Sequence, residues 1–211
     1  MSTVANVTIV YYSSTGTIYQ LADSVRAGAA EVGAEVRLRR VHELASAEAI
    51  ATNSAWAAHL AETEHIPTAT HDDLLWADAI VFGTPTRFGN VAAQLKQFMD
   101  TLSSLWHRDL LSDKVYSGFT SSASMHGGQE STLLALYNSI YHFGGILVTP
   151  GYKNHTDDSN HNPYGASYVT GDDPGSIDDA AREAAQFQGR RVATMAAALT
   201  NGLADPDTPV A

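Results

Sequence analysis

The first strongly apolar stretch of the chain runs from Val7 to Tyr12, and small polar residues follow it at once. An unbroken apolar run of this kind predicts a β-strand buried on both faces, as in parallel sheets covered by helices. A helical spacing of apolar side chains comes next, at Ile18, Leu21, Ala22, Val25, Ala29 and Val32. The pattern therefore predicts a buried strand that passes through a polar loop directly into a helix.

The same alternation continues along the chain. Further strands are predicted at 34–40, 77–83, 115–120 and 144–149, and helices at 43–60, 72–76, 91–102, around Leu133 to Ile140, and at 177–199. Asn90 is predicted to cap the helix that begins at Val91. Five alternations of strand and helix indicate a doubly wound α/β fold with a parallel sheet. We expect residues 1–211 to form a single domain, because domains usually have about this size.

Three of the predicted strands end in loops rich in hydroxyl groups and glycine. In such sheets ligands bind beyond the carboxyl ends of the strands, so these loops are predicted to form one site. The first loop is Ser13, Ser14, Thr15, Gly16, Thr17 and Ile18; the second is Thr84, Pro85, Thr86, Arg87, Phe88, Gly89 and Asn90; the third is Ser121, Ser122, Ala123, Ser124, Met125, His126, Gly127 and Gly128.

The first loop leads into a helix, and the start of a helix favours an anion. Its first backbone N–H groups lack internal partners, and the helix dipole adds partial positive charge there. The loop contains no Lys or Arg, so backbone N–H groups and hydroxyls would hold a phosphate. The alternative is that Ser and Thr side chains only cap the helix. Convergence of three such loops favours the phosphate site.

Several other α/β sites are excluded by their missing residues. No G-x-G-x-x-G follows the first strand, as a dinucleotide site requires, and no G-K-[ST] marks a P-loop. A receiver domain needs aspartates where this chain has Tyr12 and Ser13. A low-molecular-weight tyrosine phosphatase needs a cysteine there, and the chain has none.

Composition narrows the function further. The formal net charge of −11 disfavours a nucleic-acid-binding surface. Without cysteine, disulfides, thiolate catalysis and Cys-based zinc sites are excluded. No signal-peptide pattern precedes the first strand, and no apolar run approaches the ~20 residues that span a bilayer. We therefore expect a cytoplasmic protein without a membrane span.

A long polar loop is predicted from Tyr152 to Pro174, and such a loop is usually functional or part of an assembly. It contains His155, Asp157, Asp158 and His161. No helical or strand spacing brings these side chains together, so we expect a solvated loop and no metal site.

Four motifs resemble one known family. They are Tyr11-Tyr12-Ser13, Gly83-Thr84-Pro85-Thr86-Arg87-Phe88-Gly89-Asn90, His126-Gly127-Gly128-Gln129-Glu130 and Asn162-Pro163-Tyr164-Gly165-Ala166. The resemblance is to the WrbA family of flavodoxin-like NAD(P)H:quinone oxidoreductases and runs from the first strand to the last helix. The second motif is the most specific.

The resemblance implies a flavodoxin-like fold with strand order 2-1-3-4-5, bound FMN, and a homotetramer with flavin sites close to subunit boundaries. The phosphate loop of the family corresponds to 13–18, its flavin-ring loop to 84–90, and its third flavin loop to 121–128. Its active-site tryptophan corresponds to Trp106, and a histidine near the flavin corresponds to His142.

Three of these residues also have simpler interpretations. Arg87 would stabilise the negative charge of reduced flavin, or it is a surface charge. Trp106 would wall a flat apolar pocket, or it packs in the core. His142 would contact the substrate, or it interacts with the dipole at the end of its helix.

The leading hypothesis is a two-electron enzyme in which NADH or NADPH reduces FMN, leaves, and a quinone is reduced at the same flavin face. The alternatives are a flavodoxin that carries single electrons between proteins, and a non-catalytic flavin-binding scaffold. Trp106 and the 152–174 loop exceed what a bare five-stranded carrier needs. No basic cluster marks a 2′-phosphate site, so the sequence does not distinguish NADH from NADPH.

Overall fold

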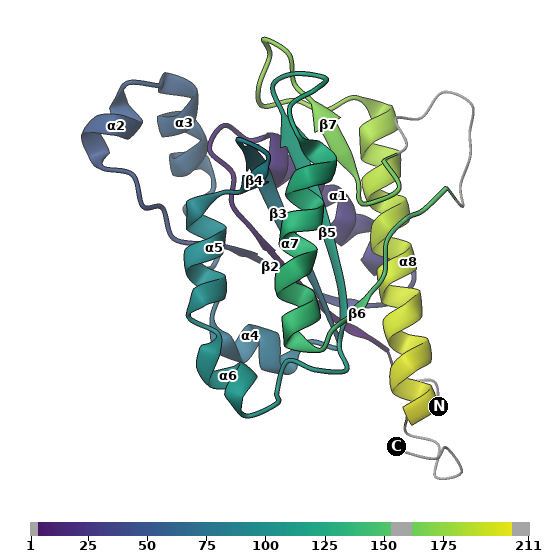
Figure 1. The fold of residues 1–211 in the computed structure, drawn as a ribbon. Coiled ribbons are helices and arrows are strands. Elements are labelled where there is room, and N and C mark those ends of the chain that lie inside the picture. Colours follow the sequence, from purple (N-terminus) through teal and green to yellow (C-terminus); the bar gives the residue numbers. More distant parts are fainter. Residues whose placement is uncertain (1–3, 153–161, 204–211) are drawn as a thin grey trace.

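The computed structural model describes residues 4–152 and 162–203, which fold around one parallel β-sheet (Figure 1). Its main strands are β1 (Asn6–Tyr11), β2 (Glu35–Arg40), β3 (Ala79–Arg87), β5 (Val115–Ser122) and β6 (Ile146–Leu147). They are hydrogen-bonded in the order β2-β1-β3-β5-β6. In chain order these are the five predicted strands, so the doubly wound α/β fold and the strand order 2-1-3-4-5 are confirmed.

Helices cover both faces of the sheet (Figure 1). On one face lie α1 (Thr17–Glu31) and α8 (Asp179–Leu203); on the other lie α4 (His71–Trp76), α5 (Ala93–Asp100), α6 (Ser103–His107) and α7 (Gln129–Phe143). Beyond the edge strand β2, the chain forms α2 (Ala47–Ala51) and α3 (Ser54–Glu62). Two hydrophobic cores result, one on each side of the sheet.

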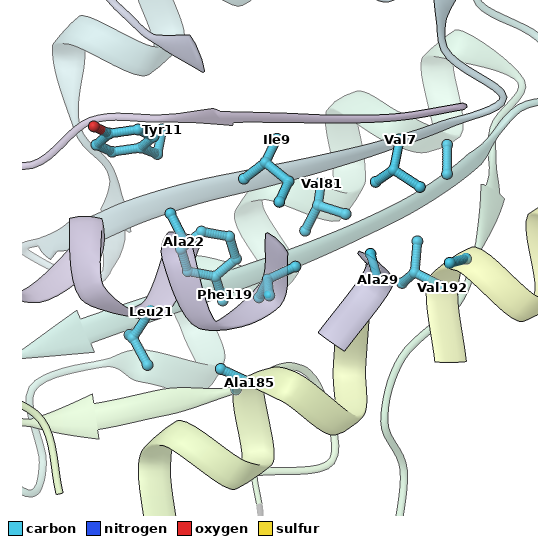
Figure 2. Close-up of a cluster of buried hydrophobic side chains, with 14 of the residues drawn as sticks. Val7, Ile9, Tyr11, Leu21, Ala22, Ala29, Val81, Phe119, Ala185 and Val192 are labelled. Atoms are coloured by element: carbon cyan, nitrogen blue, oxygen red, sulfur yellow. The ribbon is translucent and has the colours of Figure 1, made fainter. Parts of the chain in front are cut away.

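Alternation along β1 supplies both cores. Val7, Ile9 and Tyr11 point toward α1 and α8, as Figure 2 shows, whereas Val10 and Tyr12 point to the opposite face. All five are buried. Because helices cover both faces of the sheet, side chains on both sides of the strand are buried, and each large apolar one contributes about 1.5–3 kcal/mol when fully buried. The strand is therefore a continuous apolar run in the sequence.

Glycines let α1 and α8 approach closely. A Cβ atom at Gly28 would lie 1.9 Å from the carbonyl oxygen of Gln186, and one at Gly189 would lie 2.1 Å from that of Val25. Neither position accepts a side chain without moving backbone. This packing fixes the long C-terminal helix against the helix that begins at the first predicted loop.

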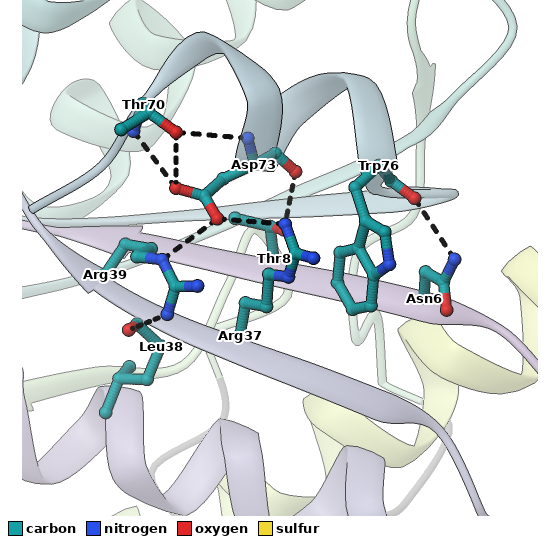
Figure 3. Close-up of polar contacts among 8 residues, drawn as sticks. All are labelled: Asn6, Thr8, Arg37, Leu38, Arg39, Thr70, Asp73 and Trp76. Atoms are coloured by element: carbon teal, nitrogen blue, oxygen red, sulfur yellow. Dashed lines mark hydrogen bonds and ion pairs between the residues drawn. The ribbon is translucent and has the colours of Figure 1, made fainter. Parts of the chain in front are cut away.

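A polar cluster fastens α4 to the sheet edge (Figure 3). The buried carboxylate of Asp73 accepts hydrogen bonds from Arg39 Nε at 2.9 Å and Arg37 Nη1 at 3.2 Å, and from Thr70 N and Oγ1 at 3.1 and 2.9 Å. The Arg37 guanidinium also lies 4.0 Å from the ring centroid of Trp76. The basic side of the edge strand therefore has a structural role.

The fifth strand differs from the prediction because it is split. Only Ile146–Leu147 of the predicted 144–149 pairs with β5, at Val115–Tyr116. A further strand, β7 (Ser167–Val169), pairs in parallel with Thr120–Ser122, inside the region predicted to be a loop. Between these two short strands Gly165 lies against β5, where a Cβ would lie 2.0 Å from the carbonyl oxygen of Gly118. That oxygen accepts a hydrogen bond from Gln188 Nε2 of α8 at 2.7 Å, so a side chain takes the place of a ladder partner.

The second predicted loop also differs, because β3 continues through Thr84 to Arg87. It then turns into β4 (Asn90–Val91), which pairs antiparallel with Thr86 and Arg87. Phe88 and Gly89, with φ of 53° and 75°, form the two-residue turn; positive φ at both positions is typical of tight hairpins. The prediction that Asn90 caps a helix is therefore wrong, since α5 begins at Ala93.

The helix predicted at 43–60 is two short helices. Ser46 caps α2 by accepting a hydrogen bond from Ala49 N, and Asn53 caps α3 by accepting one from Trp56 N. An Asn side chain competes well for the start of a helix, so the pattern breaks at Asn53.

Candidate active site

A cleft of about 480 Å³ lies beyond the carboxyl ends of the central strands. The three predicted loops meet there, together with the chain that follows β7. The lining residues are Ser13, Ser14, Thr15, Thr17, Ile18, Pro85, Thr86, Arg87, Phe88, Ser121, Ser122, Ala123, Ser124, Gly127, Thr170 and Pro174. The structure thus brings together segments that are far apart in the sequence, at the edge where parallel sheets bind ligands.

The first loop leaves the start of α1 open to an anion. Gly16 is the N-cap residue, with φ of 106°, and no side chain caps the helix. Ser13 Oγ accepts a hydrogen bond from Gly16 N at 3.1 Å, and Thr17 Oγ1 accepts one from Gly175 N at 3.0 Å. No acidic residue lies in the first turn. Ser and Thr therefore shape the loop without capping α1, which favours a phosphate at this position.

Thr86 joins the second loop to the third. Its Oγ1 donates to the carbonyl oxygen of Gly127 at 3.2 Å and accepts from Gly89 N at 3.2 Å and Thr132 Oγ1 at 2.7 Å. A Cβ at Gly128 would lie 2.9 Å from Gly89 Cα. Gly89 and Gly128 therefore let the two loops pack closely together, although neither of these two glycines lines the cleft.

Arg87 and Phe88 project from the tip of the hairpin. Arg87 Nη1 donates to the carbonyl oxygen of Thr86 at 3.2 Å, and within the described residues Arg87 forms no ion pair. Phe88 is fully exposed in spite of its size. The cleft therefore carries a cation and an aromatic side chain at its rim, both free to meet a ligand.

The third loop is held by its own backbone. Ser122 Oγ donates to the carbonyl oxygen of Ser124 at 2.7 Å, and Gly127 N donates to the same oxygen at 3.0 Å. A Cβ at Gly127 would lie 2.4 Å from that of Ser122. Met125 and His126 lie exposed at the tip and do not line the cleft.

Other predicted residues support the cleft from behind. Thr84 is buried, and its Oγ1 accepts a hydrogen bond from Ala92 N at 3.0 Å. The residues of the three predicted loops that do not line the cleft are Gly16, Thr84, Gly89, Asn90, Met125, His126 and Gly128.

Two lining residues were not predicted. Thr170 and Pro174 follow β7, and Thr170 N donates to the carbonyl oxygen of Ser122 at 2.9 Å. The sequence feature that could have found them is the short run at 167–169. If this run is recognised as a strand, the loop that follows it lies at the same edge of the sheet as the three predicted loops.

Trp106 and His142 lie together but away from this cleft. Trp106 Nε1 donates to the carbonyl oxygen of His142 at 2.8 Å, and Trp106 is 53% exposed. His142 is in the last turn of α7, whereas Gln129 at its start is beside the third loop. A rise of 1.5 Å per residue separates these two by about 20 Å, and Figure 1 shows α6 at the opposite end of the sheet. Within one chain, neither residue reaches the cleft.

A second hollow, of about 640 Å³, lies between β2 and the α2–α3 segment. It is larger than the cleft, but alanines, Ile50 and Leu60 form most of its lining, and none of the three hydroxyl- and glycine-rich loops reaches it. The smaller cleft is therefore the candidate active site.

No helix among residues 4–152 and 162–203 is long and apolar enough to cross a membrane. In the same part of the chain, no three His, Asp or Glu side chains gather to hold a metal ion. The predicted solvated segment with His155, Asp157, Asp158 and His161 lies outside the described residues.

Residues 7–155 match the model of one protein family, described as NADPH-dependent FMN reductase. The chain belongs to this family. It shares 41% identity over 203 residues with a Deinococcus radiodurans protein named NAD(P)H dehydrogenase (quinone), covering 94% of this chain and 99% of the relative. A Geobacter sulfurreducens protein of the same name is 44% identical over 204 residues, covering 92% and 98%.

A solved structure supports the same placement. The flavodoxin, WrbA-like protein from Agrobacterium tumefaciens superposes with a TM-score of 0.66 at 28% identity, covering 91% of this chain and 97% of that one. The flavodoxin-like fold and the resemblance to the WrbA family are confirmed.

The family is named for the flavin FMN, and the residues of the cleft fit this cofactor. The uncapped start of α1 suits its phosphate, and Pro85 and Ala123 give the cleft apolar walls for a flat ring.

Proposed function

We propose that the protein is an FMN-dependent oxidoreductase that passes two electrons from NAD(P)H to quinones. The observation that carries the proposal is the convergence of three hydroxyl- and glycine-rich loops on one cleft, with the start of α1 uncapped inside it. Bound FMN supplies the redox chemistry, and the protein supplies binding, orientation and electrostatics. The names of the 41–44% identical relatives agree with this activity.

The residues of the cleft have separate tasks in this proposal. Backbone N–H groups at 15, 17 and 18 and the hydroxyls of Ser14 and Thr15 would bind the phosphate, while Gly16 N stays bonded to Ser13 Oγ. The hairpin at 85–88 and the loop at 121–124 would hold the flavin ring. Arg87 supplies the positive charge that reduced flavin needs near N1 and O2. NAD(P)H and the quinone would enter the open side of the same cleft in turn.

Trp106 and His142 complete the site only in an assembly. Because both lie at the far end of α7, they reach a flavin only if it belongs to another subunit. We infer a homotetramer in which Trp106 walls the substrate pocket of a neighbour and His142 contacts its substrate. Exposed aromatic side chains support this view: Trp106 is 53% exposed, Tyr141 62% and Phe88 fully. A cytoplasmic location and a single domain over 1–211 are part of the same proposal.

The competing function is a flavodoxin that carries single electrons and needs no substrate pocket. A turnover assay separates the two. The protein is loaded with FMN, freed of excess flavin, and supplied with NADH or NADPH and benzoquinone. We expect at least one of the two nicotinamide nucleotides to be oxidised, and we expect this oxidation to require both bound FMN and the quinone. Turnover no faster than that of free FMN at the same concentration would rule out the enzyme, and the FMN-free protein is the control.

A further inference from the structure

The side chain of Glu43 accepts five hydrogen bonds, one of them from the residue before the proposed phosphate loop. It follows β2 and opens the segment that carries α2 and α3. Its Oε1 accepts hydrogen bonds from Leu44 N at 2.7 Å, Ala45 N at 2.9 Å and Gln94 Nε2 at 2.9 Å. The first two fix the carboxylate on its own backbone, and the third reaches a helix on another part of the chain.

The other oxygen of Glu43 makes two further contacts. Oε2 accepts hydrogen bonds from Tyr12 OH at 2.9 Å and from Trp56 Nε1 at 3.1 Å. All five partners are donors, which is the arrangement that suits an ionised carboxylate, an acceptor at every position.

Tyr12 connects this cluster to the phosphate loop. Its side chain is 4% exposed, and its backbone N donates to the carbonyl oxygen of Gly83 at 3.0 Å. The next residue, Ser13, lines the cleft and accepts the hydrogen bond from Gly16 N. A displaced Tyr12 would therefore move the loop that meets the phosphate.

Gln94 connects the cluster to the flavin-ring hairpin. It lies in the first turn of α5, directly after β4. Two residues earlier, Ala92 N donates to Thr84 Oγ1, inside the strand that leads to Arg87. One carboxylate thus holds both loops that the proposed flavin would bridge.

The carboxylate is ionised at neutral pH. Burial raises the pKa of Glu43, but the hydrogen bonds from Ala45, Gln94, Tyr12 and Leu44 lower it and prevail. The cluster is therefore a charged centre whose contacts are charge-assisted and stronger than neutral ones.

We propose that Glu43 is a positioning residue for FMN: by binding Tyr12 and Gln94 at once, it sets the spacing between the phosphate loop and the flavin-ring hairpin. This inference rests on the proposed function. It assigns to the α2–α3 side of the molecule a part in cofactor binding, although no residue there lines the cleft.

The test is a set of FMN affinities measured by fluorescence quenching. Glu43→Gln keeps the shape but places an NH₂ group against donors. We expect the Kd for FMN to rise about tenfold, roughly the loss of one charge-assisted hydrogen bond. Tyr12→Phe should raise it as well. Because both act through one contact, the double variant should bind little worse than Glu43→Gln alone. Glu64→Gln, the same charge change at an exposed position of this segment, should bind like the native protein.

A purely structural Glu43 would give different results. Thermal unfolding of the FMN-free variants would then show a lower midpoint, while the Kd for FMN of the folded protein stays unchanged; that outcome overturns the inference, as do strictly additive effects on binding. If Glu43→Gln does not fold, Tyr12→Phe alone decides, and native affinity in that variant contradicts the proposal. Native protein that binds no FMN overturns the proposed function as well, so the two failures are distinguishable.

Discussion

In the proposed site, Arg87 would be the side chain with the most direct electrostatic effect on a bound flavin. It stands at the end of β3, at the rim of the cleft, with a backbone carbonyl as its hydrogen-bond partner. No Asp or Glu lies between Gly83 and Gln97. A guanidinium in this place favours the fully reduced, anionic flavin over its one-electron-reduced neutral form, because only the anion gains from the positive charge.

Replacing Arg87 should therefore lower the two-electron potential of bound FMN. We expect Arg87→Ala to shift it by tens of millivolts, where about 30 mV corresponds to 1.4 kcal/mol for a two-electron couple, and to slow reduction by NADH. Arg87→Lys should restore part of the shift, since an ammonium keeps the charge but lacks the planar fork. Equilibration with reference dyes measures the potential. An unchanged potential in Arg87→Ala would show that Arg87 does not stabilise the reduced flavin.

His59 supports a prediction about pH. It is buried behind the phosphate loop, with its ring centroid 5.7 Å from that of Tyr19. Burial lowers the pKa of His59 below its ordinary value of 6.5, and the nearby Glu62 opposes this only in part. Below about pH 6.5, His59 therefore binds a proton more readily in the unfolded chain than in the folded protein. The free energy of unfolding should fall as the pH drops below that value.

The measurement is the unfolding free energy of the FMN-free protein between pH 5 and 8. His59→Gln should flatten the decline on the acid side, whereas His65→Gln, at an exposed histidine nearby, should leave it unchanged. An equally steep decline in both variants would show that other groups cause it.

Among the elements, the start of α1 is the one on which the proposed phosphate binding would depend. It is built from dipoles and hydroxyls, with no cationic side chain among residues 13–18. Thr17→Glu would place a carboxylate in the first turn, facing a phosphate dianion.

We expect Thr17→Glu to weaken FMN binding at least tenfold relative to Thr17→Gln, the neutral variant of the same shape. Riboflavin, which lacks the phosphate, should bind both variants alike. Fluorescence quenching gives all four affinities. Equal FMN affinities in the two variants would exclude the start of α1 as the phosphate site.

The elements that the sequence predicted well are those whose pattern is set by burial. β1 and α1 follow from a continuous apolar run and a helical spacing, because the strand is covered on both faces and the helix on one. The convergence of the three loops then follows from the parallel sheet itself. These two inferences were enough to find most of the cleft.

The elements that were missed depend on contacts that a local pattern does not contain. β7 is only three residues long and is defined by its pairing with Thr120 to Ser122. β4 forms because Phe88 and Gly89 adopt positive φ and turn the chain back on β3. The sequence around Asn90, an Asn before an apolar run, looks like the start of a helix and does not indicate this turn. Thr170 and Pro174 were missed for the same reason, since their place in the cleft follows from β7.

In the whole molecule, the proposed roles of Trp106 and His142 require an assembly of several copies of the chain. Trp106 and His142 are at the end of the sheet opposite to the cleft, and Phe88 stands fully exposed at its rim. Burying such surfaces against further copies of the chain would remove apolar area from water and bring the two ends together.

Sedimentation should therefore show a homotetramer at micromolar concentration in the presence of FMN. Trp106→Ala should leave the FMN phosphate contacts intact but change the reaction with quinone, since the residue would wall the pocket of a neighbour. A monomer under these conditions would contradict the assembly and the roles of Trp106 and His142 together.

In the proposed function, one cleft binds FMN and passes electron pairs from NAD(P)H to a quinone. An anaerobic titration of the FMN-loaded protein, followed through the visible flavin spectrum, decides whether it does so. We predict that NADH or NADPH converts the oxidised flavin to the fully reduced form with little one-electron-reduced flavin between them, and that an equal amount of benzoquinone restores the oxidised spectrum. A flavin that neither nucleotide reduces, or one that accumulates almost entirely in the one-electron-reduced state, would contradict the account and favour an electron carrier.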